Sequence, residues 1–353
     1  MRKDNMTSFE CTILVATAGQ GILRSNDQGQ TWHRLGLREE IEFDGTVRAL
    51  AVDPSRPERV YAGADAGLCI SDDGGVHWRR PENLLNGQTV WSIAVDPRNP
   101  RVIFAGTGAP SRAAIYRSHD AGETWTRLPP EIPEFCAGVN RPRLLTICID
   151  PDDSQQVWFG IEEGGAWRSR NGGDSWVRVD DSIPGGLRNS DIHAIAMLAS
   201  KGDDPKVNLV LTVNCVHRST DDGATWAGEL SRDRFDGLYY TRTVQAMPGS
   251  DRLLLALGDG TPGRRTRIYQ SDDRAQTWTE SRIDFPPNST VWTFGVHAAR
   301  PELVFAGTKY GDLYRSDDGG RRWHKEWRVF SEITAVAWTP IKAALVAHPQ
   351  STQ

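Results

Sequence analysis

Seven short β-rich segments of the chain share one position whose side chains could do chemistry. The second residue of these segments is, in chain order, Arg48, Trp91, Leu145, His193, Arg242, Trp292 and Thr334. Arginine can clamp a carboxylate or phosphate with two parallel hydrogen bonds, and tryptophan can lie flat on a sugar or aromatic ring. Two arginines, two tryptophans and a histidine at one repeated position are typical of a binding site. The alternative is a packed plug in which the arginines pair with nearby acids.

Nearby residues complete the candidate site. We expect His193 to act as an acid or base near neutral pH, with Asp191 or Asp236 as its carboxylate partner. Arg48, Arg242 and Arg143 would hold an anionic group of the ligand. Trp91, Trp292 and Tyr240 would pack against the rest of it.

Neither a metal nor an organic cofactor is expected. The sequence has no His-x-x-x-His or Glu-x-x-His spacing, and only His193 and His217 could face a central channel. It also has no nucleophile elbow, P-loop or dinucleotide fingerprint.

A second repeated pattern supplies the elements that position these residues. Ser-x-Asp-x-Gly-x-Thr-Trp, or a close variant of it, occurs seven times, 45 to 52 residues apart, beginning at Ser25, Ser71, Ser118, Ser169, Ser219, Ser271 and Ser316. Ser and Asp side chains can lock a tight turn, Gly supplies a positive φ, and Trp buries a large flat surface. Three copies depart from the pattern, with Asn171, Ala275 and Arg322, and we expect looser turns there.

Between these turns the chain repeats a strand, an Asp-Pro turn and a second strand, as in residues 47–63 and 90–106. Each repeat therefore predicts four strands. Residues 12–35 supply only the last three strands of a repeat, whereas Ile333–Pro340 matches a first strand with no turn motif after it. The C-terminal strand should complete the N-terminal unit and close a ring, which removes exposed sheet edges.

The repeated turn resembles the Asp box, or BNR repeat, of sialidases, sortilin-type receptors and photosystem II assembly factors. The resemblance implies an all-β, seven-bladed β-propeller with Asp-box hairpins, in which the boxes lie on the face opposite the usual active site. Residues 1–353 would form one domain, with a short tail at about 342–353. An ordinary sialidase is disfavoured, because the Phe-Arg-Ile-Pro motif is absent and seven blades are predicted where sialidases have six. Similar antibiotic-lyase propellers use a histidine base, which keeps a lyase open.

Composition narrows the class of partner and compartment. The 353 residues carry a net charge of −5, which argues against a nucleic-acid partner. The sequence has no apolar run of 18 residues, so we expect no membrane association. Five scattered cysteines without Cys-x-x-Cys, and an N-terminus that does not resemble a signal peptide, predict a cytoplasmic protein.

Two classes of function remain open. In the first, the propeller binds a small anionic or carbohydrate-like ligand at the channel mouth and acts as a glycosidase-like hydrolase or a lyase. In the second, it is a non-catalytic scaffold that binds a protein partner. A deep pocket that gathers Arg48, His193 and Arg242 would favour the first, and a flat exposed face would favour the second.

Overall fold

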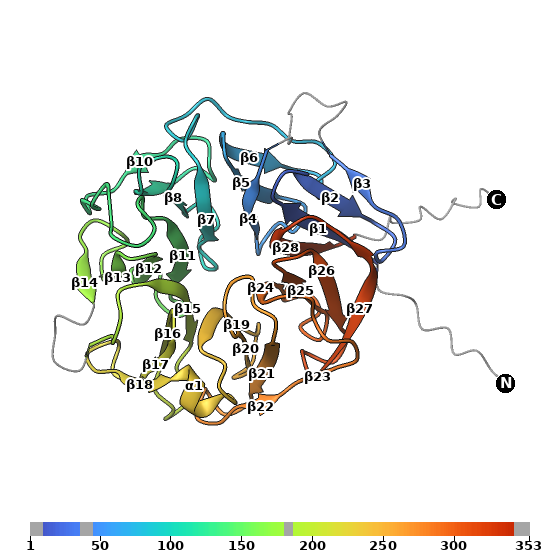
Figure 1. Cartoon of the computed structure of the whole chain (residues 1–353). Helices are drawn as coiled ribbons and strands as arrows, with labels where there is room; N and C mark the ends of the chain where they lie inside the picture. Colours follow the sequence, from blue (N-terminus) through green and yellow to red (C-terminus); the bar gives the residue numbers. More distant parts are fainter. Residues whose placement is uncertain (1–9, 36–44, 180–185, 342–353) are drawn as a thin grey trace, which may run out of the picture.

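Seven β-sheets surround a central axis in the computed structural model, which describes residues 10–35, 45–179 and 186–341 (Figure 1). This is the predicted seven-bladed, all-β propeller. The helical element of the described residues is the four-residue α1 (Ser231–Arg234). No helix in these ranges is long and apolar enough to cross a membrane. The predicted tail at 342–353 lies outside the described residues.

The blades are numbered here in chain order, each from its inner strand outward. Blade 1 comprises β28 (Ile333–Pro340), β1 (Cys11–Thr17), β2 (Ile22–Ser25) and β3 (His33–Arg34). Blade 2 comprises β4 (Val47–Val52), β5 (Val60–Ala64) and β6 (Gly67–Ser71). Blade 3 comprises β7 (Val90–Val95), β8 (Ile103–Thr107), β9 (Ile115–Ser118) and β10 (Thr126–Arg127). Blade 4 comprises β11 (Leu144–Ile149), β12 (Val157–Ile161), β13 (Gly165–Ser169) and β14 (Val177–Val179).

Blade 5 comprises β15 (Ile192–Leu198), β16 (Val207–Thr212), β17 (Cys215–Ser219) and β18 (Ala227–Leu230). Blade 6 comprises β19 (Tyr240–Ala246), β20 (Leu253–Gly258), β21 (Thr266–Ser271) and β22 (Thr279–Glu280). Blade 7 comprises β24 (Val291–Gly295), β25 (Val304–Thr308), β26 (Asp312–Ser316) and β27 (Arg322–Val329), with β23 (Arg282–Ile283) parallel to β27 at its outer edge.

The two ends of the chain close the ring in the predicted way. The C-terminal strand β28 pairs antiparallel with β1, from Cys11 opposite Pro340 to Thr17 opposite Ile333. Blade 1 is thus built from both ends of the described chain, as the blue and red strands of Figure 1 show. The closure joins the first and last blades, which would otherwise meet at an open seam.

The seven repeated turns share one set of hydrogen bonds. In every copy the Ser Oγ lies 2.7–2.9 Å from the Asp or Asn Oδ1 and accepts the amide of the fifth motif residue at 2.8–2.9 Å. Asn171, Ala275 and Arg322 fit this geometry, with Ala275 adopting a φ of 66°. The expectation of looser turns is wrong for these hydrogen bonds: the Asn171 side-chain oxygen accepts as an aspartate oxygen does, and Ala275 supplies the same backbone amide as glycine.

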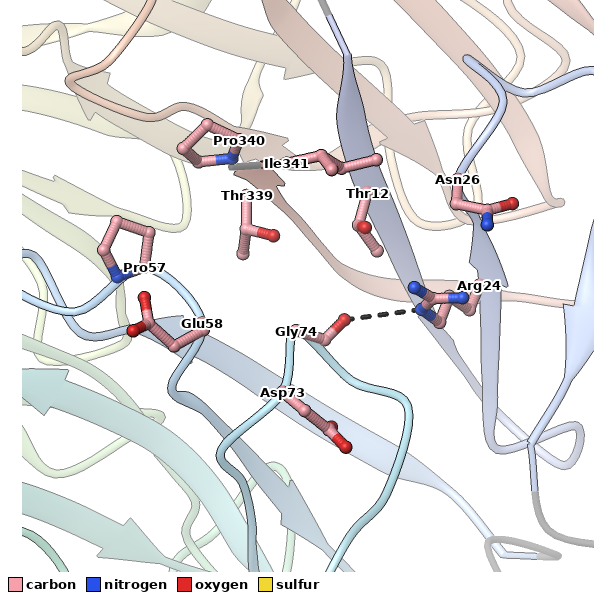
Figure 2. Close-up of a pocket in the computed structure, with 10 residues that line it drawn as sticks. All are labelled: Thr12, Arg24, Asn26, Pro57, Glu58, Asp73, Gly74, Thr339, Pro340 and Ile341. Atoms are coloured by element: carbon pink, nitrogen blue, oxygen red, sulfur yellow. Dashed lines mark hydrogen bonds between the residues drawn. The ribbon is translucent and has the colours of Figure 1, made fainter. Parts of the chain in front are cut away.

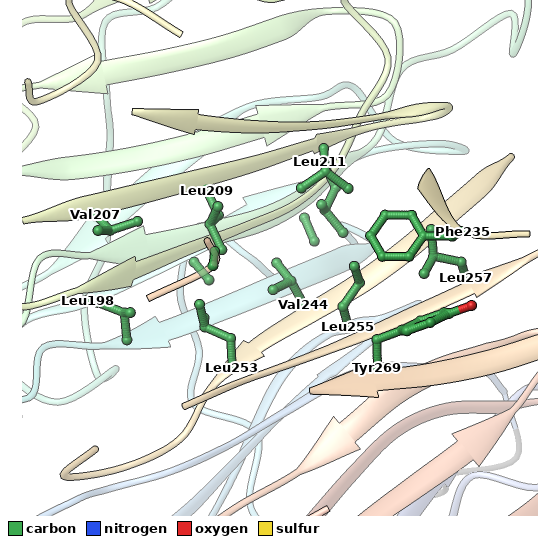
Figure 3. Packing of buried hydrophobic residues seen from close by; sticks show 14 of the residues in the cluster. Leu198, Val207, Leu209, Leu211, Phe235, Val244, Leu253, Leu255, Leu257 and Tyr269 are labelled. Carbon is green, nitrogen blue, oxygen red and sulfur yellow. The ribbon is translucent and has the colours of Figure 1, made fainter. Parts of the chain in front are cut away.

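Apolar side chains fill the spaces between neighbouring blades. Figure 3 shows one such cluster, in which leucines of β16 and β20 meet Phe235 and Tyr269 between blades 5 and 6. Burial of this surface holds each blade against the next and gives the inner strands a rigid support.

A β-bulge lies at the repeated position on all seven inner strands. On β4, for example, Val47 lies opposite Ala64 and Ala49 opposite Gly63, so that Arg48 is the extra residue. The same skip occurs at Trp91, Leu145, His193, Arg242, Trp292 and Thr334. A bulge re-aims its side chain and is common beside functional sites. The ring of residues found in the sequence therefore corresponds to a structural feature of every blade.

Candidate functional site

A cavity of about 820 Å³ occupies the central channel and its mouth. The mouth is the end of the channel at which each inner strand begins and each second strand ends. Of the nine predicted site residues, the cavity is lined by Arg48, Trp91, Arg143, His193, Tyr240, Arg242 and Trp292. Asp191 and Asp236 do not line it. The structure thus gathers side chains from residues 48 to 292 around one concave space.

Trp91 lies against two arginines. The guanidinium carbon of Arg48 is 4.0 Å from the Trp91 ring centroid, and that of Arg143 is 5.2 Å from it. The indole Nε1 donates to the carbonyl of Ala109 at 2.9 Å, which holds the ring in place. Each arginine also has an acid: Arg48 pairs with Asp65 at 2.9 Å and Arg143 with Glu162 at 2.8 Å.

Trp292 lies against a second pair of cations in blades 6 and 7. The guanidinium carbon of Arg242 is 3.8 Å from the Trp292 ring centroid, and the ammonium of Lys309 is 4.7 Å from it. Lys309 forms an ion pair with Glu332. Arg242 has no hydrogen bond or ion pair with any residue in the described ranges, and its buried Nε is unsatisfied.

These contacts change the role expected of the tryptophans. Both indole rings contact cations in this structure, so they position the cationic side chains. The sequence predicts instead that the rings pack against a ligand. Contacts of this kind contribute about 0.5–2 kcal/mol each. The cations are therefore held at defined points of the mouth.

The charged side chains that line the cavity are the cations Arg48, Arg143, Arg242 and Lys309 and the carboxylates Glu162 and Glu332. A further carboxylate at the mouth, Asp65, pairs with Arg48. Three of the four cations are therefore balanced by a paired carboxylate, and Arg242 is the cation that a negatively charged ligand could neutralise.

Glu162, Lys309 and Glu332 are not among the site residues expected from the sequence. A signal for them exists in the strand register. On each second strand, one residue lies opposite the residue that precedes the bulge, and the residues directly after it are Ala18, Asp65, Gly108, Glu162, Val213, Gly258 and Lys309. Glu332 similarly stands immediately before inner strand β28. Aligning these positions in the sequence would have placed all three residues beside the repeated ring.

His193 does not have the geometry of an open acid or base. Its side chain is only 2% exposed, and its ring packs against Tyr240 with a centroid distance of 5.0 Å. Nδ1 donates to the carbonyl of Thr241 at 2.6 Å, and Nε2 lies 3.5 Å from Asp191 Oδ1. Both nitrogens face protein groups, so the expected catalytic pair of His193 and Asp191 is corrected to a buried support beneath Tyr240.

Asp236 is also displaced from the expected role. It lies just after α1, is exposed and has a φ of 48°. It contributes nothing to the cavity, because its loop packs on the outer part of blade 6 through Phe235. His217 is buried in blade 5, where its Nε2 accepts the amide of Arg188 at 3.0 Å. No group of three or more His, Cys, Asp or Glu side chains suited to a metal occurs within residues 10–35, 45–179 and 186–341.

Burial affects the ionisation of two cavity residues. Burial lowers the pKa of the Arg242 guanidinium, while Tyr240, Glu162, Asp191 and Glu332 oppose that shift. Burial likewise raises the pKa of the Tyr240 phenol, and Arg242 opposes this. Arg242 therefore bears a desolvation cost that no local ion pair offsets.

A smaller cavity of about 280 Å³ lies at the other end of blades 1 and 2, beside the second repeated turn (Figure 2). It is lined by Thr12, Arg24, Asn26, Pro57, Glu58, Asp73, Gly74, Thr339, Pro340 and Ile341. Arg24 Nε donates to the carbonyl of Gly74 across it at 3.4 Å. This contact ties blade 1 to the turn of blade 2.

Known proteins similar to this chain include glycoside hydrolases. A xyloglucanase of Paenibacillus sp is 26% identical over 90% of this chain and 31% of its own length. The chain spans about a third of the length of the curated relatives it matches. No family model matches the sequence.

Two solved structures have the same fold. The GH74 enzyme of Niastella koreensis matches with a TM-score of 0.59 and 20% identity, over 88% of this chain and 46% of that one. YCF48 bound to D1 peptide matches with a TM-score of 0.51 and 16% identity, over 80% of this chain and 82% of that one. At these identities the comparison establishes the propeller fold alone.

Proposed function

We propose that this propeller binds an oligosaccharide at the channel mouth and hydrolyses a glycosidic bond there. The observation that carries the proposal is the cavity of about 820 Å³, in which two carboxylates, two tryptophans and a tyrosine converge. Similarity to a xyloglucanase over 90% of the chain supports the choice of a glycan. We also propose that residues 1–353 form one domain and that the seven turns are Asp boxes, which their common hydrogen bonds support.

Glycosidic hydrolysis usually needs two carboxyl groups, one to protonate the leaving oxygen and one to act as base or nucleophile. Glu162 and Glu332 are the carboxylates that line the cavity in the described ranges. Both are ion-paired, with Arg143 and Lys309. The carboxyl group that protonates the leaving oxygen must turn from its cation toward the glycan. The proposal therefore includes the opening of one ion pair on binding.

The test measures reducing-sugar release from xyloglucan and other polysaccharides by the wild-type chain, Glu162→Gln and Glu332→Gln. Each substitution should lower kcat at least a hundredfold, because positioned acid–base groups typically contribute 10²–10⁴-fold. Glu131→Gln is the matched control, since its side chain is 76% exposed and does not line the cavity. If the wild-type chain releases reducing sugar and neither cavity variant loses activity, the reaction belongs to other residues. If no polysaccharide releases reducing sugar, hydrolysis by this chain is refuted.

A non-catalytic scaffold is the second candidate. It is favoured by the match to YCF48 bound to D1 peptide, which covers 82% of that chain, whereas the glycoside hydrolases extend well beyond this one. In that case the mouth would bind a peptide, and the ion-paired carboxylates would remain structural. Binding of peptides without binding of any oligosaccharide, measured by calorimetry, would favour this candidate.

We further propose a reducing compartment such as the cytoplasm. All five cysteines are free thiols, which supports this proposal. The measurement is the cellular fraction in which a tagged chain accumulates. Recovery outside the cytoplasm would contradict it.

A further inference from the structure

We propose that Arg242 is an anion receptor and that the glycan bound at the mouth carries a carboxylate, as a uronic acid residue does. The inference rests on the proposed function and adds the chemical class of the substrate. It starts from one observation: of the four cations that line the cavity, Arg48, Arg143 and Lys309 each have a carboxylate partner, whereas Arg242 has none among the described residues.

Blade 2 offers a direct comparison for Arg242, because an arginine stands at the same position there. Arg48 occupies the same bulge position in blade 2, also lies on the tryptophan of the next blade, and pairs with Asp65. Asp65 directly follows Ala64, the residue opposite Val47. In blade 6 the corresponding position follows Leu257, opposite Thr241, and is occupied by Gly258. The acid that balances the first arginine is therefore replaced by a residue without a side chain.

The structure also prevents neighbouring groups from supplying this acid. A Cβ on Gly258 would lie 2.2 Å from Thr290 Oγ1, so a side chain has no room at that position. The next residue, Asp259, accepts the amides of Arg264 and Arg265 at 2.7 and 3.0 Å. Its carboxylate is committed to its own loop. Glu162, Asp191 and Glu332 act on Arg242 electrostatically, but none forms an ion pair with it. Glu162 and Glu332 are paired with other cations, and Asp191 lies 3.5 Å from His193 Nε2.

The guanidinium is nevertheless held ready for a ligand. It lies 3.8 Å from the Trp292 ring centroid, and that contact orients its plane. A planar guanidinium matches a planar carboxylate through two parallel hydrogen bonds. A carboxylate that entered the cavity would satisfy the donors of Arg242 and offset its desolvation. Neutral glycans offer only uncharged oxygen atoms for the same position.

The experiment compares calorimetric binding of a galacturonic acid oligomer with that of a neutral cello-oligosaccharide of equal length. Wild-type protein should bind the acidic oligomer about ten- to a hundredfold more tightly, because charge-assisted pairs are roughly twice as strong as neutral ones. Arg242→Gln should remove this preference, and Arg242→Lys should restore part of it. Arg264→Gln is the matched control, because it removes an exposed arginine outside the cavity lining. Thermal denaturation confirms that each variant is folded.

The outcomes separate this inference from the proposed function. Equal affinity of the wild-type protein for both oligomers would overturn the anion receptor and leave glycan binding intact. An acidic preference that survives in Arg242→Gln, or that Arg264→Gln lowers equally, would also overturn it, since the general field of the protein would then be the cause. Failure of both oligomers and of xyloglucan fragments to bind would instead count against the proposed function.

Discussion

Replacement of Ser316 by alanine should show how much one repeated turn contributes to stability. The Ser316 side chain is fully buried, accepts the amide of Gly320 at 2.9 Å and donates to Asp318 Oδ1 at 2.8 Å. Alanine leaves the buried amide of Gly320 without a partner, which costs about 1–3 kcal/mol. It also removes the partly exposed hydrogen bond to Asp318, for which we take the typical net value of about 1 kcal/mol. The free energy of unfolding should therefore fall by about 2–4 kcal/mol.

Differential scanning calorimetry measures this loss as a lower melting temperature. An unfolding entropy of about 2.1 cal/mol/K per residue gives roughly 0.7 kcal/mol/K for a chain of this size, so Tm should fall by about 3–5 °C. Thr277→Ala, in the sixth copy of the motif, is the control. Thr277 is exposed, its hydroxyl donates to Asp273 at 2.5 Å, and the seventh turn forms with Arg322 in the equivalent place. Its loss should stay below about 1 kcal/mol.

The reasoning is refuted if Ser316→Ala lowers Tm by less than 1 °C, or by no more than Thr277→Ala does. Either result would mean that water reaches the Gly320 amide and that the turn does not depend on its serine. It would also remove the physical basis for interpreting the seven motifs as structural.

Further predictions concern blade packing and pH. Gly160→Ala should lower the free energy of unfolding by about 1–3 kcal/mol, because the new Cβ would lie 2.3 Å from Ile192 Cγ2 and 2.8 Å from Thr146 Cγ2. Urea unfolding measures this loss. Gly45→Ala is the control and should cost nothing, because its nearest contact would be at 3.7 Å. Burial lowers the pKa of His217 to about 4, so the unfolded chain binds a proton at higher pH than the folded one. Stability should therefore fall as pH drops from about 6.5 to 4, and His217→Gln should flatten that slope in melting temperatures measured across the range; an unchanged slope would assign the effect to other groups.

The number of blades and the closure of the ring could be predicted from sequence because their causes are local. Eight consecutive residues contain the donors and acceptors of each turn, so the motif beginning at Ser25 or Ser316 forms the same hydrogen bonds wherever it occurs. The spacing of the motifs then sets the number of blades. The unmatched strands at the two ends leave one way to complete blade 1.

The positions of the ring residues could also be predicted from the sequence, because Arg48, Trp91 and Arg242 stand at one place in a repeated pattern. The residues that they contact could not be predicted in this way. Pairing of Arg48 with Asp65 depends on the register between β4 and β5, and burial of His193 beneath Tyr240 depends on how blades 5 and 6 pack.

The sequence by itself determined the propeller and the ring of candidate residues at its mouth. Only the tertiary structure decided which of those residues can meet a ligand, because ion pairing and burial are set by groups far apart in the chain. Arg242 illustrates the difference. As a residue type it equals Arg48, but Gly258 and the amides that hold Asp259 leave its charge unbalanced in the cavity.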